Sequence, residues 1–123
     1  MKQPDQTAGK GRRKQLLLEQ ITAYVDANLT KRLTLKQIAE QFGVSVSTVT
    51  QLYQKRTNTT FHQFLTARRM EMARNLIAQG KPLESVGKEV GYQDHSTFYR
   101  AFHQTYGISP REYRKTEPRE VVK

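Results

Sequence analysis

The sequence predicts an all-α protein in which two helix-turn-helix subdomains are joined by a long linker helix, with about seven helices in total. Three observations support this prediction. Apolar residues recur at helical spacing along most of the chain, no segment shows the sustained alternation of a β-strand, and one helix-turn-helix pattern occurs twice. The length of 123 residues suits one domain, or two small subdomains that share a helix.

The repeat is the strongest of these observations. Its first copy begins LTLKQIAEQFGVS and its second begins KPLESVGKEVGYQ, and the two copies span residues 33–64 and 81–113. The matched pairs are Ile38 with Val86, Ala39 with Gly87, Gly43 with Gly91 and, after the offset grows by one residue, Val49 with Phe98. Each copy therefore predicts a helix, a turn with a central glycine, and a second helix.

The N-terminal part should hold an arm and one helix. Residues 1–13 are polar and basic and include Pro4 and two glycines, which predicts a disordered arm. Apolar residues then follow helical spacing from Leu16 to Leu29, which predicts a first helix that ends near Asn28.

Within the first copy, a capping box, a glycine and a serine mark the ends of two helices. We expect these helices over residues 35–42 and about 46–56. The residues that set their ends are Thr34 with Gln37, then Gly43, then Ser45 or Ser47.

A longer helix is predicted over residues 61–79, because its apolar residues form one stripe and Thr60 and Gly80 mark its ends. The second copy should hold helices over about 82–90 and 95–106, and Ser-Pro-Arg-Glu at 109–112 starts a last short helix. The expected organisation is an arm (1–13), a first subdomain (14–60), the linker helix (61–79), a second subdomain (80–115) and a flexible tail (116–123).

The charge balance predicts a polyanionic partner. The chain has 21 Lys and Arg against 11 Asp and Glu, for a net charge of +10. Nucleic acid and an anionic membrane both fit that charge, as does a protein that is merely basic. The absence of cysteine excludes disulfides and thiol chemistry and fits a reducing cytoplasm. The N-terminus lacks the apolar region of a signal peptide, and every apolar run is too short to span a bilayer.

Catalysis is not expected. The three histidines do not stand at i, i+4 spacing, no pair of carboxylates suits acid–base work, and no complete phosphate-binding loop is present. We therefore predict neither an enzyme nor a cofactor or metal site.

The second helix of each copy has a polar face that suits a DNA major groove. The stretch from Ser45 to Gln54 contains neither Glu nor Lys, which a merely solvated face usually carries. Glutamine can bridge N6 and N7 of adenine, and arginine can bridge O6 and N7 of guanine. Gln51 in the first copy and Arg100 in the second stand at matching positions.

Three stretches, LTLKQIAEQFGVS, ARRMEMARNLI and VGYQDHSTFYRAFHQTYGISPREYR, resemble the DNA-binding domain of the AraC/XylS family of bacterial transcription regulators. The resemblance covers about residues 16–115 and implies two helix-turn-helix subdomains joined by a long helix. By position, it implies base reading by Ser47, Thr50, Gln51, His95, Ser96 and Arg100. We expect phosphate contacts from Thr48, Lys55, Arg56, Thr97, Arg111 and Arg114.

The sequence departs from the family pattern at four positions. Gln51 stands where the family often has arginine, and Ser47 stands where it has a bulkier residue, which alters the expected grip of the first subdomain. Asn58 replaces a common glycine but tolerates the left-handed conformation. Gly87 replaces a common alanine and should weaken its helix by about 0.5–1 kcal/mol.

The resemblance implies a sequence-specific transcription regulator, expected to be an activator. The repeated helix-turn-helix itself suggests that one chain binds double-stranded DNA as a monomer, through two adjacent major grooves. RNA polymerase is a further expected partner, no membrane is, and the expected location is the bacterial nucleoid in the cytoplasm. The length is similar to that of the small stand-alone family members, although an excised domain would also fit, and Met1 favours a complete protein. The alternative is a nonspecific architectural or RNA-binding protein. A DNA-repair enzyme that transfers alkyl groups would need a nucleophilic cysteine, and this chain contains none.

Overall fold

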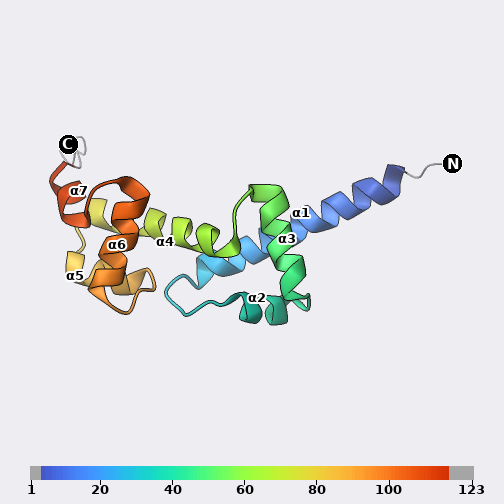
Figure 1. The fold of residues 1–123 in the computed structure, drawn as a ribbon, viewed down its shortest axis with the longest axis horizontal. Helices are drawn as coiled ribbons and strands as arrows, with labels where there is room; N and C mark the ends of the chain where they lie inside the picture. Colours follow the sequence, from blue (N-terminus) through green and yellow to red (C-terminus); the bar gives the residue numbers. More distant parts are fainter. Residues whose placement is uncertain (1–3, 117–123) are drawn as a thin grey trace. The chain divides into compact units, whose positions relative to one another are not determined.

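The computed structural model describes residues 4–116, which fold into seven α-helices without a β-strand (Figure 1). The prediction of an all-α fold is therefore confirmed. The helices are α1 (Pro4–Ala27), α2 (Leu35–Phe42), α3 (Val46–Thr57), α4 (Phe61–Ala78), α5 (Leu83–Glu89), α6 (His95–Tyr106) and α7 (Pro110–Thr116).

The chain divides into two compact units. The first unit contains α1, α2, α3 and the start of α4 up to Phe64, and the second contains the rest of α4 with α5, α6 and α7. The short segment Leu29–Arg32, which follows α1, belongs to the second unit. The helix predicted as a linker is thus one continuous helix that contributes residues to both units.

Helix α1 starts earlier than the sequence analysis predicted. We expected residues 1–13 to form a disordered arm, but residues 4–13 belong to α1. Pro4 is the first residue of the helix, where its missing N–H is not needed. Further along, Arg56 of α3 donates hydrogen bonds to the carbonyl of Gly11 (3.2 Å) and to Oε1 of Gln15 (3.2 Å). This tertiary contact could not be read from local composition. Residues 1–3 lie outside the described residues, as do residues 117–123, which make up most of the expected tail.

In the first unit, local side chains set the helix ends as predicted. Thr34 accepts from the N–H of Gln37, whose side chain accepts from the N–H of Thr34. Ser45, one of the two candidate caps, accepts from the N–H of Thr48 at 3.0 Å. Asn58 adopts the left-handed conformation, with φ of 58°, at the end of α3.

In the second unit, the predicted cap of α7 forms, because Ser109 and Glu112 exchange hydrogen bonds. No capping residue was predicted for α6. The structure shows that Asp94 caps this helix by accepting from the N–H of Thr97 at 2.8 Å. Gly91 must be glycine: its φ is +104°, and a Cβ there would lie 2.5 Å from the carbonyl oxygen of Leu29.

Each unit has its own apolar core. In the first, Tyr53 of α3 is fully buried, and its ring centroid lies 5.4 Å from that of Phe61 and 4.8 Å from that of Phe64. The core residues of the second unit are Met70, Ala73, Ile77, Val86, Val90, Phe98 and Phe102. Burial of such side chains contributes about 1.5–3 kcal/mol each, so the inward faces of α3 and α6 are fixed by packing.

Arg69 makes its contacts within the second unit. It donates to the carbonyls of Leu29 (3.2 Å) and Lys31 (2.8 Å), and its guanidinium lies 5.8 Å from the ring centroid of Tyr92. Burial lowers the pKa of Arg69 and raises that of Tyr92. Arg69 therefore anchors the segment after α1 instead of facing a ligand.

Candidate nucleic-acid interface

The outward face of α3, the green helix in Figure 1, carries hydroxyl and amide groups. Ser47, Thr50 and Gln51 are all exposed, whereas Val49 and Tyr53 on the inward face are fully buried. Nε2 of Gln51 lies 3.4 Å from Oγ of Ser47 and donates to it. Gln51 and Ser47, two of the predicted base-reading residues, are therefore in contact across one turn of α3.

The outward face of α6, the orange helix in Figure 1, carries His95, Ser96 and Arg100, which are also exposed. Phe98 and Phe102 hold the opposite face in the core. All six predicted base-reading residues are therefore accessible, as base reading requires.

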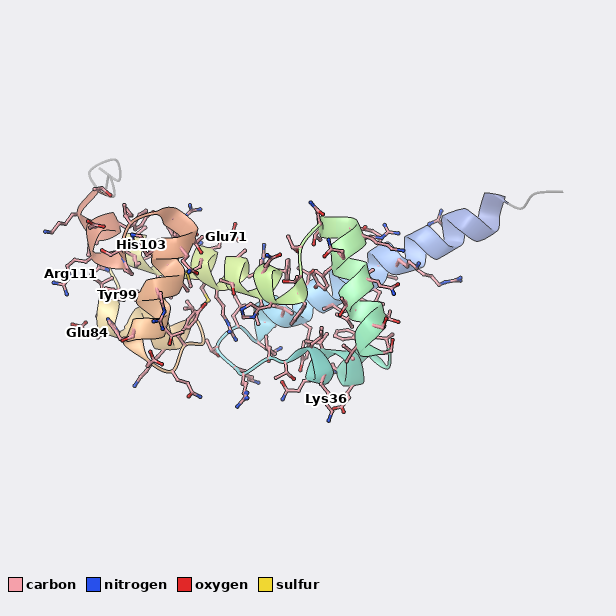
Figure 2. The ribbon with its side chains drawn as sticks, in the orientation of Figure 1. Lys36, Glu71, Glu84, Tyr99, His103 and Arg111 are labelled. Atoms are coloured by element: carbon pink, nitrogen blue, oxygen red, sulfur yellow. The ribbon has the colours of Figure 1, made fainter. Side chains whose placement is uncertain are left out.

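His95, a predicted base-reading residue on α6, contacts the ring of Tyr99. Its ring centroid lies 4.6 Å from that of Tyr99, at an interplanar angle of 35°. Tyr99 and His103 both project from α6 (Figure 2). The contact with half-buried Tyr99 restricts the orientations that the His95 ring can take.

Asp94 is a charged residue of this face that the sequence analysis missed. Besides its bond from the N–H of Thr97, it accepts from the Thr97 hydroxyl at 3.0 Å. These hydrogen bonds, helped by the positive charge of Arg100, lower the pKa of the Asp94 carboxyl. An acidic residue just before a predicted helix was a usable N-cap signal.

The two threonines expected to contact phosphate take part in helix caps. The Thr97 hydroxyl donates to Asp94, so in this arrangement it does not donate to a phosphate. The Thr48 hydroxyl lies 2.9 Å from that of Ser45, which is the cap of α3. Both hydroxyls that were expected to contact phosphate therefore bond to capping residues of their own helices.

Arg114, one of the predicted phosphate contacts, bonds to backbone carbonyls of the second unit. Its guanidinium is half-buried and donates to the carbonyl of Ile77 at 3.3 Å and to that of Lys81. Ile77 lies in the last turn of α4, and its carbonyl also accepts from the N–H of Gly80 at 3.0 Å. A cation at this end is also favoured by the helix dipole. Arg114 is thus a structural cap of α4.

The remaining predicted phosphate contacts lie on the surface. Lys55 and Arg111 are exposed, and Arg111 projects from α7 (Figure 2). Arg56 is exposed too, but its guanidinium bonds to α1 as described above.

A groove in the first unit, of about 440 Å³, lies beside the outward face of α3. We call it the α1–α3 groove, because all of its lining residues come from these two helices. They are Lys14, Gln15, Leu17, Thr48, Gln51, Leu52, Lys55 and Arg56. Lys14 was missed by sequence reasoning, since no local signal shows that α1 runs beside α3.

Metal binding and membrane insertion have no support within residues 4–116. This part of the chain contains no cluster of three or more His, Cys, Asp or Glu placed to hold a metal ion. Its helices include none that is long and apolar enough to cross a membrane.

Comparison with known proteins gives the family. Residues 38–116 match the family described as "Helix-turn-helix domain". The melibiose operon regulatory protein of Escherichia coli K12 is 27% identical over 105 residues, which are 85% of this chain and 35% of that protein. The chain thus spans about a third of the length of this relative.

Solved structures agree with the fold. A transcriptional regulator with an AraC-type DNA-binding domain from Chromobacterium violaceum has a TM-score of 0.78 and 25% identity, covering 85% of this chain and 96% of that one. The DNA-binding domain of AdpA, solved with a target DNA, has a TM-score of 0.75 and 20% identity, covering 80% and 89%. The chain therefore belongs to the AraC-type helix-turn-helix family, whose members are DNA-binding transcription regulators and not enzymes.

Proposed function

We propose that this protein recognises one asymmetric DNA site as a monomer, with α3 and α6 each reading a major groove. The observation that carries the proposal is the construction of these two helices. Each has an inward face fixed in an apolar core and an outward face of exposed polar groups. The AdpA domain has the same fold and was solved on a target DNA.

The chemistry of the two faces differs, which supports an asymmetric site. Gln51 offers an amide that can bond N6 and N7 of adenine, while Arg100 offers a guanidinium suited to guanine. Further polar side chains can contact bases from both helices: Ser47 and Thr50 on α3, and His95 and Ser96 on α6. Exposed Lys55 and Arg111 supply phosphate contacts that fix register without reading sequence.

We further propose that the protein activates transcription and touches RNA polymerase when bound. This part rests on the family resemblance. In vitro transcription from a promoter with the bound site should rise when the protein is added. Repression of that template would assign the opposite sign, and no change would remove the proposed contact with polymerase.

DNase I footprinting in the presence of competitor DNA tests the specificity. We expect protection of one discrete region of roughly 20 base pairs, because two recognition helices should read grooves about one helical turn apart. Diffuse protection that competitor abolishes would instead indicate a nonspecific architectural protein.

A further inference from the structure

The α1–α3 groove is positively charged on both sides and partly apolar within. Lys14 comes from α1, Lys55 and Arg56 come from α3, and no acidic residue lines the groove. Leu52 is buried and Leu17 half-buried among its lining residues. Such a site suits a compact anionic group that sits between two ammonium groups.

Arg56 differs from the two lysines because its guanidinium is committed within the protein. It bonds the Gly11 carbonyl and the Gln15 side chain, and so links α3 to the part of α1 around residues 11–15. Arg56 thereby keeps Lys14 at the groove, where the lysine side chains of α1 and α3 remain to receive a ligand.

The groove is continuous with the base-reading face of α3. Thr48, Gln51 and Lys55 all line it, and their spacing of three and four residues puts them on one side of the helix. If Gln51 reads a base, the anion nearest to this groove is the phosphate backbone beside that base. This continuity favours DNA over an acidic protein as the occupant.

We propose that the α1–α3 groove seats a backbone phosphate at the edge of the major groove that α3 reads. Lys14 and Lys55 are its ligands, and Arg56 is a positioning residue. The inference rests on the proposed function and adds α1 to the DNA-contacting elements. It also reassigns Arg56 from phosphate contact to support of Lys14.

The test compares Lys14→Ala with Arg13→Ala. Both residues are exposed cations on α1, but only Lys14 lines the groove. Each phosphate contact contributes about 0.9 to the slope of log K against log salt. Lys14→Ala should therefore make the slope shallower by about one, with the base preference unchanged. Arg13→Ala should leave the slope nearly as in the wild type.

A second comparison tests the role of Arg56. In an Arg56→Ala background, Lys14→Ala should lose most of its effect on the slope, because Lys14 is no longer held at the groove. Equal effects of Lys14→Ala and Arg13→Ala would overturn the proposal in favour of general electrostatic attraction. An unchanged slope for Lys14→Ala would also overturn it. A wild-type protein that protects no discrete site would instead refute the proposed function itself.

Discussion

Arg100 is the guanidinium on the outward face of α6, at the position that Gln51 holds in α3. The planar guanidinium of Arg100 can donate two hydrogen bonds to one guanine, a geometry that lysine or glutamine cannot reproduce equally well. We expect Arg100→Ala to cost about 1–3 kcal/mol on the preferred site and to relax preference at one G·C pair.

Binding to duplexes substituted at each base pair measures this effect. Arg111→Ala is the control, since an exposed phosphate contact should weaken all sequences alike. A uniform loss for Arg100→Ala, with no position relaxed, would remove Arg100 from the base-reading residues.

Arg114 should matter for stability and not for recognition. Its guanidinium bonds the carbonyls of Ile77 and Lys81, so Arg114→Ala leaves both without that partner. We expect a loss of about 1–3 kcal/mol in the free energy of unfolding. Chemical denaturation of this variant beside Arg111→Ala, which should unfold like the wild type, decides the matter. Wild-type stability together with weaker DNA binding would restore the role in phosphate contact.

Asp94 should make α6 sensitive to acid. Because its pKa is lowered in the folded state, its stabilising contribution is complete above the ordinary aspartate pKa of about 3.9 and is lost as pH falls through the lower folded value. Asp94→Ser keeps a capping oxygen but removes this titration. Thermal unfolding below about pH 4 should therefore show a steeper loss for the wild type than for Asp94→Ser. Parallel curves would show that the cap does not titrate.

At the scale of helices, Gly87 of α5 packs against Phe98 of α6. From its backbone freedom alone, Gly87 is expected to weaken α5 relative to alanine. The structure shows a compensating reason for glycine, since a Cβ at this position would lie 3.1 Å from Cγ and Cδ2 of buried Phe98. In the first unit the equivalent positions hold the larger Ala39 and the smaller Val49.

We therefore expect Gly87→Ala to give no net stabilisation, because crowding of about 1–3 kcal/mol opposes a helix gain of about 0.5–1 kcal/mol. In a Phe98→Val background the same substitution should stabilise by about the helix gain alone. A double-mutant cycle of unfolding free energies measures this coupling. Additive effects would mean that Phe98 moves aside freely.

The helices and most of their ends could be predicted because their signals are local. Capping residues, glycine turns and apolar spacing lie within a few residues of the feature that they set, as at Thr34 and Ser109. Contacts between residues far apart in the sequence could not be predicted. The bonds of Arg56 to α1 and of Arg114 to α4 join residues more than thirty positions apart. Nothing near either arginine in the sequence distinguishes it from a surface cation.

At the scale of the whole molecule, one chain holds two candidate recognition helices, α3 and α6, that are similar in plan but chemically different. The two copies share their apolar plan, and their outward faces differ at the positions of Gln51 and Arg100. One chain should therefore suffice for one site, and the two halves of that site should differ in sequence. A partner subunit would be needed only if one of the helices did not contact DNA.

Selection of binding sites from a random duplex library tests this most directly. We expect one enriched, asymmetric sequence of roughly 20 base pairs, with two conserved blocks about one helical turn apart. One block should prefer a guanine that depends on Arg100. Enrichment of a palindrome would contradict binding as a monomer, and the absence of any enriched sequence would contradict specific recognition.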